Sequence, residues 1–186
     1  MIGILKRLLG LSDRDDSVTR CYHRVVDQSR LPDFYRVCGV PDTLDGRFDM
    51  LAVHAFLVMH RLKGRGISAE RFSRRLFETM ITDMDRTMRE MGVGDMGVPR
   101  HVKAMAQGFN GRIHAYNDAL AAPGDEALLV ALDNNLYGTV LSPDAAMLAL
   151  LAGYIRSAVT CLEEQTLDRI LAGDLQFPAL SLDGVS

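Results

Sequence analysis

The stretch Met50-Leu-Ala-Val-His-Ala-Phe-Leu-Val-Met59 decides the fold, because every residue in it except His54 is apolar. A helix that is apolar on nearly all sides is the buried centre of a bundle. A run of only about ten residues is too short to cross a bilayer. We therefore predict that a helix beginning near Thr43 is surrounded by other helices. His54 is expected to be a hydrogen-bonded core histidine rather than a metal ligand.

Helical spacing of apolar residues continues on both sides of this segment, and the alternation typical of strands is absent. Further helices are expected at 18–30, 68–91, 99–120, 123–137 and 143–165, with short helical segments at 33–37 and 166–172. The predicted fold is all-α, a compact single-domain bundle of about six or seven helices at 15–173. An amphipathic N-terminal segment and linker at 1–14 precedes it, and an extended tail at 174–186 follows.

Two glycines, Gly108 and Gly111, lie inside the helix expected at 99–120. Each costs about 1 kcal/mol relative to alanine in a helix interior. Close approach by a neighbouring helix is the expected compensation at both positions.

Composition excludes some classes of partner. The formal net charge is −3, aromatic residues make up 6% and there is no Trp, which argues against DNA or RNA as the partner. The three cysteines have no metal-ligand spacing and suit a reducing cytosol.

The N-terminus carries an apolar segment broken by two cations, with Ile4, Leu5, Lys6, Arg7 and Leu8 at its centre. It is too short to span a membrane and lacks the cleavage site of a secretory signal. It is expected to lie on an anionic membrane surface or to dock on the bundle or a partner. The sequence favours neither alternative.

No arrangement of residues predicts catalysis, a bound metal or a cofactor. The five histidines form neither HxxxH nor HExxH. Gly92, Gly94 and Gly97 spell GxGxxG, but a helix rather than a strand precedes them, so the expected structure is a turn between helices. Gly92 is expected to end the preceding helix in a left-handed conformation. A weak anion site near Arg100 and Lys103 is the secondary interpretation.

Methionine is unusually frequent, with ten in the chain and five within 17 positions: Met80, Met84, Met88, Met91 and Met96. Methionine recurs on surfaces that accept varied apolar partners, and it also fills ordinary cores. The five are therefore candidates for binding a hydrophobic client, with core packing as the alternative.

Several motifs resemble the bacterial branch of the ubiquinol–cytochrome c chaperone family, and the resemblance runs from about residue 20 to residue 138. They are Val40-Pro-Asp-Thr-Leu-Asp-Gly-Arg-Phe-Asp-Met50, Asp83-Met-Asp-Arg86, Arg89-Glu-Met-Gly-Val-Gly-Asp-Met-Gly97 and Phe109-Asn-Gly-Arg112 with Tyr116. The resemblance makes Asp85, Arg86, Gly92, Gly94, Asp95, Gly97, Arg112 and Tyr116 candidate functional residues.

The resemblance implies an all-α chaperone, not an enzyme, that promotes assembly of the cytochrome bc1 complex. Its implied client is newly made cytochrome b, a hydrophobic membrane protein, with the ribosome and a small partner subunit as further partners. The implied location is cytoplasmic, with peripheral contact at the inner face of the plasma membrane. Asp133-Asn134-Asn135 departs from the family pattern, where relatives often have Trp-Arg-Asn or Arg-Arg-Asn. A helical regulatory adaptor that binds a soluble protein is the alternative function.

Overall fold

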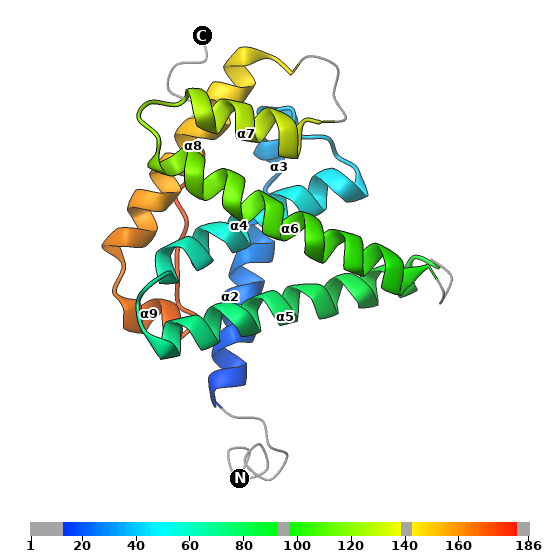
Figure 1. The fold of residues 1–186 in the computed structure, drawn as a ribbon, viewed down its shortest axis with the longest axis vertical. Coiled ribbons are helices and arrows are strands. Elements are labelled where there is room, and N and C mark those ends of the chain that lie inside the picture. Colours follow the sequence, from blue (N-terminus) through cyan, green and yellow to red (C-terminus); the bar gives the residue numbers. More distant parts are fainter. Residues whose placement is uncertain (1–12, 93–96, 139–142, 182–186) are drawn as a thin grey trace.

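Residues 13–92, 97–138 and 143–181 are described by a computed structural model, and within these ranges the regular structure is entirely helical (Figure 1). Six helices have eleven residues or more: α2 (Asp13–Ser29), α4 (Leu44–Leu62), α5 (Ile67–Glu90), α6 (Val98–Ala121), α7 (Glu126–Leu136) and α8 (Ala145–Glu164). Two short helices of five residues each, α3 (Pro32–Arg36) and α9 (Leu167–Leu171), complete the described part. The prediction of an all-α bundle is confirmed.

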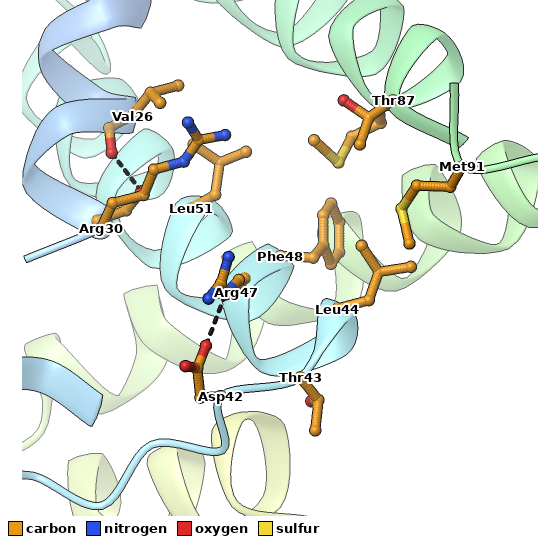
Figure 2. Close-up of a pocket in the computed structure, with 12 residues that line it drawn as sticks. Val26, Arg30, Asp42, Thr43, Leu44, Arg47, Phe48, Leu51, Thr87 and Met91 are labelled. Atoms are coloured by element: carbon orange, nitrogen blue, oxygen red, sulfur yellow. Dashed lines mark hydrogen bonds and ion pairs between the residues drawn. The ribbon is translucent and has the colours of Figure 1, made fainter. Parts of the chain in front are cut away.

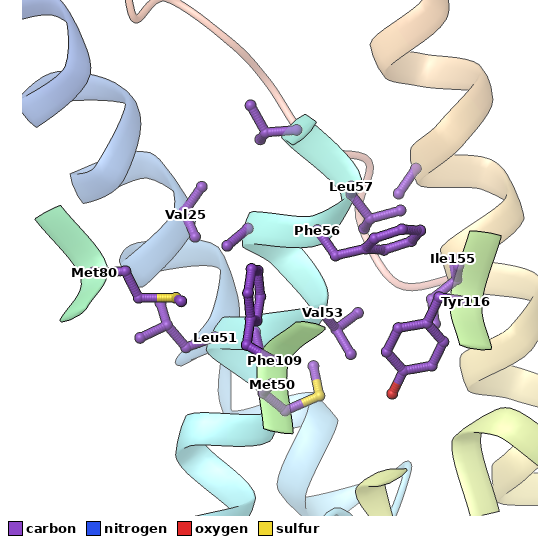
Figure 3. Packing of buried hydrophobic residues seen from close by; sticks show 14 of the residues in the cluster. Val25, Met50, Leu51, Val53, Phe56, Leu57, Met80, Phe109, Tyr116 and Ile155 are labelled. Atoms are coloured by element: carbon purple, nitrogen blue, oxygen red, sulfur yellow. The ribbon is translucent and has the colours of Figure 1, made fainter. Parts of the chain in front are cut away.

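Helix α4 lies at the centre of the bundle and contacts α2, α5, α6, α7 and α8. All residues from 50 to 58 are buried. Figure 3 shows the packing, with Val25 of α2 and Met80 of α5 on one side of α4 and Tyr116 of α6 and Ile155 of α8 on the other. The continuous apolar run therefore forms the core helix that its composition predicts.

The first turn of α4 is fixed by a side-chain cap and a close backbone approach. The Thr43 hydroxyl accepts a hydrogen bond from the Gly46 N–H at 3.1 Å, which satisfies one of the free donors at the helix start. A Cβ atom on Gly46 would lie 2.0 Å from the Pro41 carbonyl oxygen. Only glycine fits where the preceding loop crosses this turn.

His54 is completely buried and is held by two hydrogen bonds. Its Nδ1 lies 2.8 Å from the Met50 carbonyl oxygen and its Nε2 lies 2.8 Å from the Tyr154 hydroxyl. Because a carbonyl only accepts, Nδ1 carries the proton and Nε2 accepts from Tyr154. Burial lowers the pKa of His54 to about 4, so the ring is neutral, and the prediction of a core histidine is confirmed.

The residues after α9 run extended across the bundle. Leu175 is buried, and the Phe177 ring meets the His54 ring edge-on with 5.2 Å between centroids. The Gln165 side chain accepts from the Gln176 N–H and donates to the Gln176 carbonyl. Up to residue 181 this segment is therefore part of the packed structure.

Helix α8 is long and apolar enough to cross a membrane by length and composition alone. The core helix of a soluble protein passes the same test, and α8 packs against α4 and α7.

Three sequence expectations about local structure are wrong. Helix α2 begins at Asp13, not at Val18. Helix α7 begins at Glu126 rather than at residue 123, because Gly124 has a left-handed φ of +72° that a helix cannot continue through. No neighbouring helix approaches the two α6 glycines: a Cβ on Gly108 would meet the Arg112 side chain of the same helix, and one on Gly111 would meet nothing within 4 Å.

Gly46, which lies against backbone, and Gly111, which lies in open space, predict opposite effects of substitution by alanine. Gly46→Ala should destabilise the fold by at least about 2 kcal/mol, because the new methyl group collides with backbone. Gly111→Ala, the same change in open space within a helix, should stabilise it by roughly 0.5–1 kcal/mol. Urea unfolding followed by circular dichroism measures both. Equal effects at the two positions would show that the Pro41 contact is not the constraint.

His54 predicts a loss of stability in acid. The unfolded chain takes up a proton at His54 near its ordinary pKa of 6.5, whereas the folded chain resists until about pH 4. The free energy of unfolding should therefore fall by about 3 kcal/mol from this residue alone as pH drops through that window. In urea titrations, the difference in free energy of unfolding between the parent and His54→Gln should shrink as pH falls through this range. His101→Gln, at an exposed histidine, is the matched control and should change the free energy of unfolding by no more than about 0.5 kcal/mol.

Candidate binding groove

A groove opens where the first turns of α4 emerge between the C-terminal ends of α2 and α5 (Figure 2). We call it the α2–α4–α5 groove. It encloses a cavity of about 290 Å³ and is lined by Val26, Ser29, Arg30, Asp42, Thr43, Leu44, Arg47, Phe48, Leu51, Met84, Thr87 and Met91.

The floor and the mouth of the groove are both apolar. Phe48, Leu51 and Met84 form the floor and are buried. Leu44 and Met91 lie at the mouth, with 40% and 59% of their surface exposed, and Figure 2 shows both beside the Phe48 ring. Burying exposed apolar surface of this kind is the main source of binding free energy between proteins. The groove can therefore hold an apolar side chain from a partner.

The predicted client-binding methionines divide into three groups. Met80 and Met88 are buried in α5, as the core alternative describes. Met84 and Met91 line the α2–α4–α5 groove. Met96 lies outside the described residues. Of the four described methionines, only Met91 is exposed, and Met84 lies in the floor of the groove.

Arg112 and Tyr116 belong to a polar cluster between α4 and α6. Arg112 forms an ion pair with Asp49 at 2.6 Å, and its guanidinium lies 5.7 Å from the centre of the Phe48 ring. Burial raises the pKa of Asp49 to about 6, and the Arg112 charge opposes that shift only in part. The Tyr116 hydroxyl and Arg112 Nε are buried without a hydrogen-bond partner among the described residues. The cluster ties α6 to the same α4 turn that carries the groove floor.

Asp85 and Arg86 lie on α5 in helical ion pairs. Asp85 pairs with Arg89 at 2.7 Å, and Arg86 pairs with Asp83 at 2.6 Å and with Glu90 at 3.9 Å. Such exposed pairs typically contribute a few tenths of a kcal/mol.

Asp83 has a further role that the sequence pattern does not reveal. It accepts a hydrogen bond from the Tyr22 hydroxyl at 2.8 Å and so joins α2 to α5. The two residues are 61 positions apart, so no local signal indicates the bond.

The glycine-rich stretch connects α5 to α6. Gly92 ends α5 with a left-handed φ of +79°, as predicted, and Gly97 directly precedes α6. Gly94 and Asp95 lie outside the described residues, as do Ile4, Leu5, Lys6, Arg7 and Leu8. Helices on both sides of the stretch exclude the strand-to-helix context that a dinucleotide fingerprint requires.

No group of three or more metal-ligating side chains occurs within the described ranges. Leu44 and Phe48 of the groove lie in the Val40–Met50 motif that carries the family resemblance, but neither they nor Val26 were proposed as binding residues from the sequence. The fold and groove define an all-helical bundle with an apolar groove at its surface.

The chain belongs to the ubiquinol–cytochrome c chaperone family, whose profile matches residues 36–177. It is 27% identical over 149 residues to ubiquinol-cytochrome-c reductase complex assembly factor 1 of Xenopus laevis, covering 80% of this chain and 72% of that protein. It is 25% identical over 162 residues to the Homo sapiens protein of that name, covering 87% of this chain but only 54% of the relative.

A solved structure has the same fold. The crystal structure of the Cbp3 homolog from Brucella abortus superposes with a TM-score of 0.81 at 33% sequence identity. The superposition covers 97% of this chain and 98% of that one. The family expected from the motifs is therefore confirmed.

Glutamate substitutions distinguish core from groove along α5. Met88→Glu should destabilise the fold by about 3 kcal/mol or more, because it buries a carboxylate at a position with 3% exposure. Met91→Glu should change stability by no more than about 0.5 kcal/mol. Thermal unfolding compares the two variants with the parent. A Met88→Glu protein as stable as the parent would show that this side chain faces solvent.

Proposed function

We propose that this chain is a chaperone for assembly of the cytochrome bc1 complex and that newly made cytochrome b is its client. The observation that carries the proposal is the family match over residues 36–177, a range that includes all of α4 and α5. The relatives' names support the same process, since they are assembly factors of ubiquinol–cytochrome c reductase.

The α2–α4–α5 groove is the proposed contact surface for the client. A newly made membrane protein exposes apolar side chains that aggregate in water, and a chaperone protects them by covering them. Leu44 and Met91 at the mouth supply exposed apolar surface, and Met84 lines the floor of the groove. The flexible methionine side chains allow the groove to accept different client side chains.

Further partners belong to the same proposal. The family resemblance supports a small partner subunit and the ribosome. The segment containing Ile4, Leu5, Lys6, Arg7 and Leu8 is proposed to touch the inner face of the plasma membrane or a partner. The protein itself would then work in the cytoplasm, at the place where its client enters the bilayer.

Deletion of the gene in the native host tests the function. The assembled complex should fall severalfold, as measured by native gels and by the absorbance of haem b and haem c1. Cells that lack the protein and still contain normal amounts of the complex would rule out the proposed function.

Rescue of the deletion strain tests the groove. Leu44→Glu with Met91→Glu should fail to restore the complex, because both charges stand at the groove mouth. Ile67→Glu with Val130→Glu is the matched control at two exposed apolar residues that do not line the groove, and it should restore the complex. Equal rescue by both pairs would remove the groove from the proposal. Co-purification of soluble partners only, after detergent extraction, would favour the adaptor alternative.

A further inference from the structure

Three arginines gather at one edge of the α2–α4–α5 groove. Arg30 and Arg47 line the groove itself. With Arg36 they also line an adjoining cavity of about 260 Å³, next to Asp42. Among the residues that line the two cavities, three arginines therefore stand against one carboxylate, Asp42.

These cations are available to a partner. In the described part of the chain, Arg30 and Arg36 form no ion pair with a carboxylate and both are exposed. Arg47 pairs with Asp42 at 2.6 Å, but the two side chains are 61% and 58% exposed. A pair this exposed contributes little to stability, so a carboxylate from a partner can replace Asp42 at low cost.

The shape of the groove limits what can occupy it. Its cavity of about 290 Å³ lies at the lower limit for a drug-sized ligand, a size that suits one or two large side chains. The three elements around it are helices, so no strand edge is offered. Recognition must therefore come from side chains, as when an amphipathic helix lies in a groove.

We propose that the groove binds an acidic amphipathic segment of a partner protein. The segment places large apolar side chains over Phe48, Leu51 and Met84 and a neighbouring carboxylate against Arg30 and Arg47. This inference rests on the proposed function, because it specifies the chemistry of the client or partner segment that the groove accepts. Arginine suits this role, since its guanidinium can hold a carboxylate through two parallel hydrogen bonds.

A membrane surface fits the same residues less well. A flat anionic bilayer would meet the carboxylates of Asp33, Asp42 and Asp45 together with the arginines, and all three lie exposed in this region. It would also fail to reach the recessed floor formed by Phe48 and Met84. A single carboxylate on a helix can contact the arginines without meeting these acids.

Two synthetic peptides test the proposal in the full-length protein. Both are fluorescent amphipathic helices of about 15 residues with leucines at successive turns of one face. One has glutamates beside the leucines, and the other has glutamines at the same positions. Fluorescence anisotropy should show the glutamate peptide binding roughly tenfold more tightly to the parent protein. The preference should shrink as salt is added.

Substitution of the arginines tests whether they cause the preference for the glutamate peptide. Arg30→Gln with Arg47→Gln should bind both peptides with the weaker affinity and should remain folded, since both residues are exposed. Arg74→Gln is the control at an exposed arginine of α5 outside the groove, and it should keep the full preference.

Other outcomes overturn the proposal. Equal binding of the two peptides by the parent, or no binding of either at the highest soluble concentration, contradicts it. Phosphatidylglycerol vesicles bound by the parent and lost in the arginine variant, without any peptide preference, would assign the edge to lipid. If neither the parent nor the arginine variant prefers the glutamate peptide, while gene deletion abolishes the complex, the inference fails and the proposed function stands. Normal complex after deletion removes the proposed function, whichever peptide binds.

Discussion

Burial of α4 is the constraint on which the rest of the molecule depends. Its residues from 50 to 58 are buried on every side, so α2, α5, α6, α7 and α8 must each present an apolar face to it. The one polar side chain in the run, His54, obtains its partners from Met50 within α4 and from Tyr154 of α8. An unpartnered imidazole there would cost a few kcal/mol, so the position of α8 is tied to that hydrogen bond as well as to apolar packing.

The groove follows from the same arrangement, because the first turns of α4 are not covered by α2 and α5 on this side. Helix α2 ends at Ser29 and α5 ends at Glu90, and the first turns of α4 emerge between these two ends. Leu51, one turn further into the bundle than Phe48, is buried, whereas Leu44 is exposed. The Thr43 cap, the Gly46 approach and the Arg112–Asp49 ion pair hold this emerging part of α4 rigid. A preformed groove of this kind binds without an ordering cost for its own backbone.

Local signals made much of the fold predictable from sequence. The apolar run of α4 and the left-handed end at Gly92 depend on neighbouring residues, and the structure contains both of them. Contacts between distant residues were not predictable. Arg112 and Asp49 are 63 positions apart, and nothing near either residue indicates the other. Gly108 and Gly111 were misread for the converse reason, since a glycine in sequence does not say whether its missing side chain meets a neighbour or solvent.

The burial of successive side chains on one helix face was also not predictable from the sequence. A spacing of four places Met80, Met84 and Met88 on one face of α5, and Met91 continues that face, yet the first three are buried and Met91 is 59% exposed. The difference arises because Met91 lies one residue past the end of α5, beyond the helices that cover its earlier turns.

The net charge of the chain likewise does not indicate where charges gather. A total of −3 averages over the whole surface and does not reveal that Arg30, Arg36 and Arg47 stand together. An apolar groove alone would accept almost any hydrophobic chain, and a charged edge beside it is what allows one segment to be preferred over another.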